Sequence, residues 1–294
     1  MSGGSDSTFA RRMLGRQLRH LRETSGVSVE VARKAIGVGA QTIWRFETGQ
    51  STRISGLHVR ELCRIYGAPS EVTEVLLELV NGLGHKSWWH VYGDAVPKHF
   101  DLYLGLEAAA SSLVTYQPAL LPGLVQTEGY RRAVIWSNYP SMSTLEVERR
   151  IEVATRRQAR LREDPDFTVE ILLSEAVLRH RVGGGAVIAN QLRYLAEASG
   201  LPNITVRVAP FTATHVGLGV GVFSLLEFPP HPTAWLSEPP VVYVQGYTSA
   251  QYLERPEEVS RYSEAVAQIR RVALSEQETR KLVLEIAEEH DEQR

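Results

Sequence analysis

The first quarter of the chain has apolar residues at helical spacing. Leu14, Leu18 and Leu21 follow one another at intervals of four and three residues, which predicts an amphipathic helix over residues 14–23. A further apolar helical face ends just before Gly67. Arginines occupy many of the intervening positions, so each helix has one apolar and one charged face. The pattern predicts a small helical bundle.

Two short helices separated by a glycine are predicted inside this bundle. Ser28 is placed as the N-cap of a helix over residues 29–36. Gly37 then allows a tight turn before a third helix over residues 40–48. Two short helices joined by such a turn form the helix-turn-helix arrangement, whose second helix fits the major groove of DNA. The sequence therefore predicts double-stranded DNA as a partner.

The residues of this recognition helix divide into an inward and an outward set. Ile43 and Phe46 are expected to face the core, which leaves four side chains for base contacts: Gln41, Thr42, Trp44 and Arg45. Glutamine can pair with adenine and arginine with guanine. Ser28, Ser51 and Arg53 flank the two helices and are expected to contact phosphates. Packing of Trp44 on a neighbouring side chain stays open as an alternative to DNA contact.

The remainder of the chain mixes strand and helix patterns. Residues 167–173 alternate in the manner of a strand, and further strands are predicted over 204–208, 220–228 and 241–245. Helices are predicted before, between and after them, the longest over 144–163. The order of these elements predicts a mixed sheet covered by helices.

These patterns predict a multidomain chain. A helix is expected near residues 102–113, followed by an irregular segment that contains two prolines and a glycine. The predicted parts are an all-α helix-turn-helix domain over residues 1–67, a helical connector over 68–99 and an α+β domain over 100–294.

Charge and cysteine content narrow the possible functions. Residues 1–66 contain 11 Lys and Arg against five Asp and Glu, whereas the rest of the chain contains 21 against 29. A basic module on an acidic body indicates a polyanion partner for the module alone. The single cysteine, Cys63, excludes an internal disulfide framework and favours a cytoplasmic protein. No apolar stretch approaches the roughly 20 residues that a membrane span needs, so no membrane partner is expected.

The run LRHLRETSGVSVEVARKAIGVGAQTIWRFETGQ resembles the phage-repressor type of helix-turn-helix, the Xre/Cro family. The resemblance implies a lambda-repressor-like fold and binding as a dimer. It also implies that Glu47 pairs with an arginine of the first helix, for which Arg22 is the candidate. The chain departs from the family pattern at Val29, Arg33, Gly39 and Trp44, and these changes bear on the bases read more than on the fold.

The larger part of the chain resembles a second family. The blocks YQPALLPGLVQTEGYRRAVI, RRIEVATRRQARL, LLSEAVLRHRVGG and QLRYLAEASGLPNITVRVAPF follow in the order seen in the C-terminal domain of actinobacterial helix-turn-helix regulators, labelled Scr1-like or antitoxin-like. The match covers most of residues 100–275. It implies a cytoplasmic transcriptional regulator from a Streptomyces-like bacterium, a homodimer, and a small partner protein encoded nearby. An antitoxin-like protein that sequesters this partner and regulates its own operon is the alternative.

The C-terminal body shows no catalytic pattern. The chain has no HExxH or GxSxG motif and no phosphate-binding loop, so no enzyme activity, cofactor or metal is expected. Arg149, Arg156 and Arg160 fall broadly on one face of the predicted helix over 144–163 and are candidates for binding an acidic partner or ligand. Their pairing with neighbouring glutamates is the alternative. Gln126 is a candidate for lining the site of a small-molecule effector.

Overall fold

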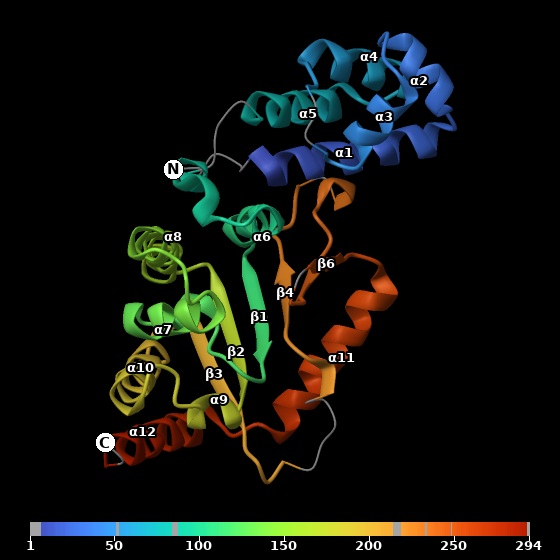
Figure 1. The fold of residues 1–294 in the computed structure, drawn as a ribbon. Coiled ribbons are helices and arrows are strands. Elements are labelled where there is room, and N and C mark those ends of the chain that lie inside the picture. The colour runs from blue at the N-terminus through green and yellow to red at the C-terminus, as the bar shows by residue number, and fades with distance from the viewer. Residues whose placement is uncertain are drawn as a thin grey trace. The chain divides into compact units, whose positions relative to one another are not determined.

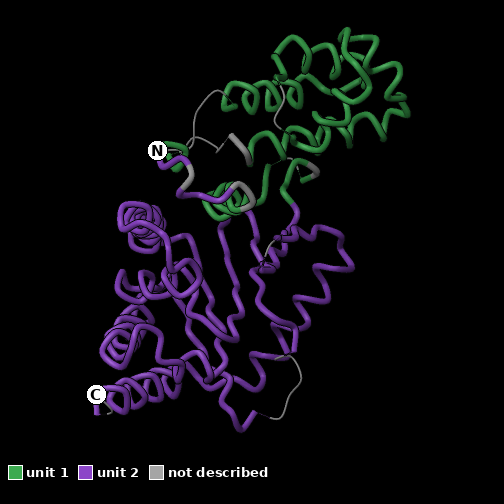
Figure 2. The backbone as a smooth tube through the Cα atoms, in the orientation of Figure 1, with its two compact units in different colours: residues 1–91, 100–109, 230–238 green, residues 92–99, 110–229, 239–294 purple. Residues whose placement is uncertain are grey.

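The computed structural model describes residues 7–50, 53–83, 88–213, 219–232, 234–247 and 249–292. The chain forms two compact units (Figure 2). Unit 1 comprises residues 1–91, 100–109 and 230–238, and unit 2 comprises residues 92–99, 110–229 and 239–294. Unit 1 therefore takes a short segment from late in the sequence into a domain that is otherwise N-terminal.

Five helices form most of unit 1 (Figure 1): α1 (Ser7–Ser25), α2 (Val29–Ala35), α3 (Ala40–Glu47), α4 (Gly56–Tyr66) and α5 (Ser70–Gly82). Their shared core consists of buried apolar side chains from all five helices, among them Leu14, Ala32, Ile43, Leu62 and Leu76. The predicted helix-turn-helix bundle is confirmed. The first helix begins seven residues earlier than the apolar spacing indicated.

Glycine lets α1 and α3 approach each other closely. A Cβ atom on Gly15 would lie 2.2 Å from the carbonyl oxygen of Phe46. The turn between α2 and α3 contains Gly37 with a φ of 67°, a left-handed conformation that favours glycine. The two glycines thus fix the position of α3 within the bundle.

Two further segments complete unit 1. The 3₁₀ helix η1 (Trp88–Ala95) begins in this unit, and Trp89 donates a hydrogen bond from Nε1 to Asp101 of α6 (Lys98–Ala109) at 2.7 Å. The second segment contains the 3₁₀ helix η4 (Ala234–Leu236), in which Leu236 is buried. Both segments contribute buried side chains beside the five-helix bundle.

Unit 2 is built on a six-stranded mixed sheet with the strand order β3-β2-β1-β4-β5-β6. The strands are β1 (Ser112–Gln117), β2 (Thr168–Ser174), β3 (Ile204–Ala209), β4 (Phe223–Glu227), β5 (Val241–Gln245) and β6 (Ala250–Leu253). The first three pair in parallel and the last three in antiparallel. The predicted mixed sheet covered by helices is confirmed.

Helices lie on both faces of this sheet (Figure 1). One face carries α7 (Glu128–Asn138), α8 (Thr144–Glu163) and α10 (Gly185–Ala198), and the other carries α11 (Pro256–Val272). The short helices η2 (Gly123–Val125) and α9 (Ala176–Arg179) connect elements, and α12 (Glu276–Glu292) packs on α10 and the edge strand β3. None of the helices in the described part of the chain is long and apolar enough to cross a lipid bilayer.

Strand β1 was not among the predicted strands. The helix expected near residues 102–113 ends at Ala109, and the strand Ser112–Gln117 takes the place of its last residues and of the start of the segment expected to be irregular from residue 116. This strand lies in the middle of the sheet, and four of its six residues are buried. Side chains on both faces are therefore covered, so the strand lacks the alternation that marks a half-exposed strand.

Candidate nucleic-acid interface

Helix α3 presents one face to the core and the other to solvent. Ile43 and Phe46 are 1% and 4% exposed, because they pack into the bundle as the sequence indicated. Gln41, Trp44 and Arg45 are exposed on the opposite side, where positions i, i+3 and i+4 of a helix fall on one face. Thr42 lies between the two faces and is half-buried. The candidate base-reading side chains therefore share one accessible surface.

Unit 1 contains two classes of exposed basic side chain. Several pair with a glutamate of their own helix: Arg19 with Glu23, Arg33 and Lys34 with Glu30, and Arg64 with Glu61. The side chains of Arg45 and Arg53 have no hydrogen-bond or ion-pair partner among the residues that the structure describes. Uncompensated positive charge is therefore found on α3 and in the segment that follows it.

A bidentate ion pair holds α3 against α1. Arg22 donates from Nε to Glu47 Oε1 at 2.5 Å and from Nη2 to Oε2 at 3.0 Å. The hydrogen bonds with Glu47 raise the pKa of Arg22 against the opposing effect of burial. Burial and the negative charge of Glu47 also raise the pKa of Tyr66. The pairing that the resemblance implied is thus present, and it fixes the end of α3.

The candidate phosphate contacts lie at the edges of this arrangement. Ser28 caps α2, and its hydroxyl oxygen accepts a hydrogen bond from the backbone N–H of Val31 at 3.2 Å. Its hydroxyl proton remains available to a phosphate oxygen. Arg53 is exposed, whereas Ser51 lies outside the described residues. Gly39 occupies the N-cap of α3 without a side-chain hydrogen bond.

Two of the candidate partner-binding residues are engaged inside unit 2. Gln126 is buried and donates a hydrogen bond from Nε2 to the carbonyl oxygen of Leu121 at 2.5 Å. Arg160 bonds to Asp164 and to the carbonyl oxygen of Ala110, and its guanidinium lies 3.8 Å from the centre of the Phe167 ring. Both side chains stabilise local structure in this conformation.

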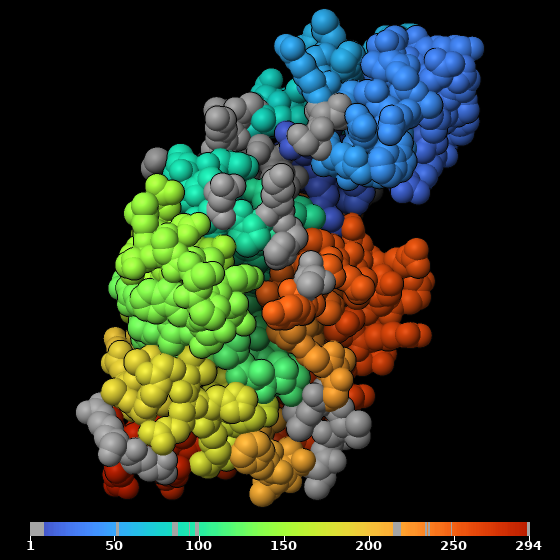
Figure 3. Space-filling model, viewed as in Figure 1, coloured from blue at the N-terminus to red at the C-terminus, as the bar shows by residue number. Residues whose placement is uncertain are grey.

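The other two candidates are exposed on α8. Arg149 and Arg156 lie on the solvent side of this helix. Sequence reasoning missed the large apolar side chains near them: Trp136, Tyr139 and Leu145 are 37%, 54% and 63% exposed. Figure 3 shows the α7–α8 hairpin on the outside of its unit. The sequence could have indicated this surface, because three large apolar residues stand around the predicted start of a charged helix.

Comparison with known families finds one matching profile for the N-terminal part of the chain and one for the C-terminal part. A family profile described as "Domain of unknown function (DUF5753)" matches residues 100–285, which is more than half of the chain. A second profile, described as "Helix-turn-helix domain", matches residues 13–76 and so contains the whole of α2, α3 and α4. No curated protein and no solved structure matches the chain.

Proposed function

This chain belongs to the DUF5753 family and carries a helix-turn-helix domain ahead of that domain, and we propose that it is a sequence-specific, non-enzymatic transcriptional regulator. The observation that carries the proposal is the outward face of α3. Gln41 and Arg45 are exposed there, and neither side chain has a partner among the residues that the structure describes. A helix of this kind fits the major groove.

Each candidate residue has a distinct proposed role at the DNA. Gln41 and Arg45 hydrogen-bond to base edges, with Thr42 beside them. Trp44 makes an apolar contact, for which a thymine methyl group is the natural partner in the major groove. DNA phosphates are held by Ser28, Ser51 and Arg53. These contacts set the register of α3 along the groove.

The C-terminal domain is proposed to mediate dimerisation and to receive a signal. Phage-repressor-type modules bind as dimers to half-sites about one helical turn apart, and this geometry requires a second copy of the chain. We place the protein among Xre-type regulators of actinobacterial cytoplasm, associated with the nucleoid when DNA is bound. The signal is a small partner protein or a small molecule.

The decisive experiment compares two arginines that differ in charge compensation. A genome-wide footprint of the tagged chain first identifies the operator. Binding to this operator is then measured for Arg45→Ala and for the matched control Arg64→Ala, whose guanidinium pairs with Glu61. We expect Arg45→Ala to weaken specific binding by about 10- to 100-fold, as for loss of one bidentate base contact. Unchanged operator affinity in a folded Arg45→Ala protein contradicts the proposal.

An antitoxin-like role is a second candidate that one observation favours. Trp136, Tyr139 and Leu145 expose apolar surface on the α7–α8 hairpin, with Arg149 and Arg156 on the same hairpin. Tryptophan, tyrosine and arginine are the side chains most enriched at the centres of protein interfaces. A small acidic partner protein would find both apolar contacts and positive charge there.

Co-expression tests this second role. The chain is tagged and co-expressed with the product of the adjacent small reading frame, and the stoichiometry of the purified complex is measured. We expect Trp136→Ala to release the partner and Leu284→Ala, on the surface of α12, to retain it. Absence of a stoichiometric complex with the unaltered chain eliminates the antitoxin-like role.

A further inference from the structure

The face of the sheet that α11 covers is polar at one end. In β1, β2 and β3 every second side chain belongs to this face, and the strand register aligns Ser112 with Thr168 and Val114 with Glu170. The next strand adds Thr205, which pairs with Glu170, and Arg207, which pairs with Leu172. The intervening residues Ile171, Val206 and Val208 are buried on the opposite face. The polar side chains of these three strands thus lie together on one face of the sheet.

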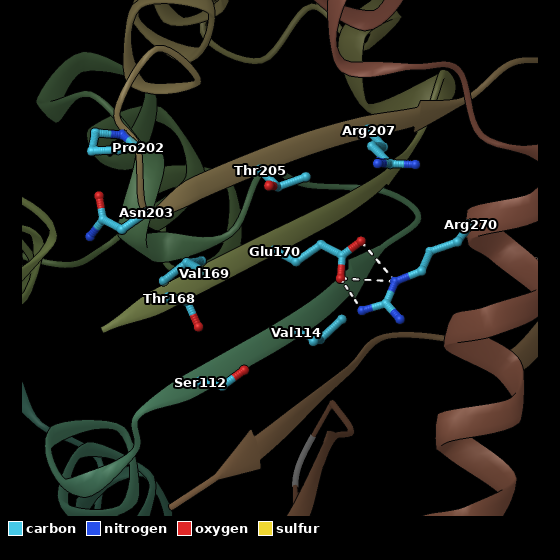
Figure 4. A pocket seen from close by; sticks show the side chains of 10 residues that line it. All are labelled: Ser112, Val114, Thr168, Val169, Glu170, Pro202, Asn203, Thr205, Arg207 and Arg270. Atoms are coloured by element: carbon cyan, nitrogen blue, oxygen red, sulfur yellow. Dashed lines mark hydrogen bonds and ion pairs between the residues drawn. The ribbon is translucent and has the colours of Figure 1, made fainter. Parts of the chain in front are cut away.

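Helix α11 covers only part of this face. Val266 and Ile269 pack on Tyr116, Leu172 and Phe223, and these residues form a continuous apolar core. Beyond that core α11 does not cover the sheet, and the uncovered part of this face lines a cavity of about 430 Å³ (Figure 4). We call it the sheet-face cavity; it is lined by Ser112, Val114, Thr168, Val169, Glu170, Pro202, Asn203, Thr205, Arg207 and Arg270. A volume of this size lies within the range of small-molecule sites.

One ion pair fixes the wall of the sheet-face cavity. Arg270 of α11 donates from Nε to both carboxylate oxygens of Glu170, at 2.9 and 3.0 Å, and also from Nη2. Figure 4 shows this pair spanning the space between β2 and α11. The side chain of Glu170 is only 14% exposed. Its charge is therefore compensated, and the pair acts as a fixed polar wall.

Arg207 is left with an unused donor. Its Nε is buried and has no acceptor among the residues that the structure describes. Its Nη2 lies 3.6 Å from Glu276 Oε1, beyond hydrogen-bond distance, and Glu276 is more than half exposed. The terminal nitrogens of Arg207 therefore make no hydrogen bond to any described residue, and they can donate to a ligand.

The chemistry of the lining selects the ligand. Two arginines and one glutamate line the cavity, and Glu276 lies beside Arg207. The hydroxyl groups of Ser112 and Thr205 have no hydrogen-bond partner among the described residues and add donors and acceptors. An oxyanion satisfies the arginine donors, and hydroxyl groups on the same molecule satisfy the serine and threonine side chains.

We propose that the sheet-face cavity binds a small hydroxylated molecule through an oxyanion group, either a phosphate or a carboxylate. Arg207 donates from its terminal nitrogens to the oxyanion, and Thr205 and Ser112 bond to the hydroxyl groups. The Glu170–Arg270 pair orients the guanidinium of Arg270 toward the same group. Binding at this site does not depend on the proposed regulatory function, so either can fail without the other.

The test uses the full-length chain and two defined probes, inorganic phosphate and citrate. Binding is measured by calorimetry at matched ionic strength, for the unaltered protein, for Arg207→Gln, and for the control Arg261→Gln on the exposed side of α11. We expect saturable binding of at least one probe. Arg207→Gln should weaken it about tenfold or more, as for loss of a charge-assisted hydrogen bond, and Arg261→Gln should not.

The outcomes of this experiment distinguish a phosphate ligand from a carboxylate ligand. Binding of phosphate alone assigns a phosphate ester, and binding of citrate alone assigns a hydroxy acid. Thr205→Val provides the test without loss of charge should Arg207→Gln fold poorly. Arg45→Ala must retain full affinity, since α3 is not part of this site. Absence of saturable binding, or equal binding by the unaltered and Arg207→Gln proteins, overturns the proposal.

Discussion

Arg16 of α1 donates a hydrogen bond from Nη2 to Glu238 Oε2 at 2.6 Å, although 222 positions separate the two residues. The same nitrogen bonds to the carbonyl oxygen of Ser237 at 3.1 Å, and Arg12 Nε lies 3.7 Å from Glu238 Oε1. The Glu238 side chain is 2% exposed. A segment that follows β4 and precedes β5 thus supplies a buried carboxylate to the helix-turn-helix unit.

Loss of this carboxylate is expected to destabilise unit 1. Glu238→Gln removes the carboxylate that Arg16 and Arg12 both face in a largely buried site. We expect a loss of about 2 kcal/mol or more in the free energy of unfolding, somewhat below the range for fully buried pairs because Arg16 is 27% exposed. Glu264→Gln, an exposed position of α11, is the matched control.

Cys63 reports the opening of this unit. It is the only cysteine, it is 1% exposed, and burial raises the pKa of its thiol. The thiol therefore reacts with an alkylating reagent only when the bundle opens. Faster alkylation of Cys63 in Glu238→Gln than in Glu264→Gln is the expected result. Equal rates would show that the segment around Glu238 does not stabilise the bundle.

Gly15 should tolerate no larger residue. A Cβ atom at this position would lie 2.2 Å from the Phe46 carbonyl oxygen and 3.0 Å from the Gly49 nitrogen, so α1 and α3 must separate. We expect Gly15→Ala to lower the melting temperature and weaken DNA binding, even though alanine favours helices. Gly219→Ala is the control, because no atom would lie within 4 Å of a Cβ at that position. Equal melting temperatures for the two variants would refute this close packing.

The Arg22–Glu47 pair predicts an asymmetric double-mutant cycle. Arg22→Ala leaves Glu47, whose side chain is 8% exposed, charged and unpaired. We expect this change to cost about 2–3 kcal/mol, more than Glu47→Gln, which keeps a hydrogen-bond acceptor. The double variant should recover part of the loss, and denaturant unfolding of all four proteins measures the coupling. Strict additivity would mean that the two side chains contribute independently.

Local patterns in the sequence were sufficient to predict the helices of the helix-turn-helix unit and their buried faces. The spacing of Ile43 and Phe46 predicted which side of α3 faces the core, and Ser28 was recognisable as a cap because capping acts within one turn. Helix α8 begins and ends where its pattern indicated, at Thr144 and Glu163. Each of these features depends on residues only a few positions apart.

Features that depend on distant residues were not accessible in the same way. Strand β1 is covered on both faces by other elements, so its sequence carries no alternation. Gln126 and Arg160 were expected to be available to a ligand, but they contact backbone carbonyl groups that only the fold brings near. Glu238 gave no signal either, since its partner Arg16 lies at the other end of the chain. Sequence spacing cannot reveal which distant segments meet.

Two uncompensated arginines of the DNA-binding unit, Arg45 and Arg53, should differ in how they respond to salt and to base sequence. Arg53 is proposed to contact a phosphate, so Arg53→Ala should weaken binding to all sequences alike and reduce the slope of log affinity against log salt by about 1. Arg45 is proposed to contact a base, so Arg45→Ala should reduce the preference for the operator over unrelated DNA. Titrations at several salt concentrations on both DNAs separate the two effects. A slope change confined to Arg45→Ala would place Arg45 at a phosphate and contradict both assignments.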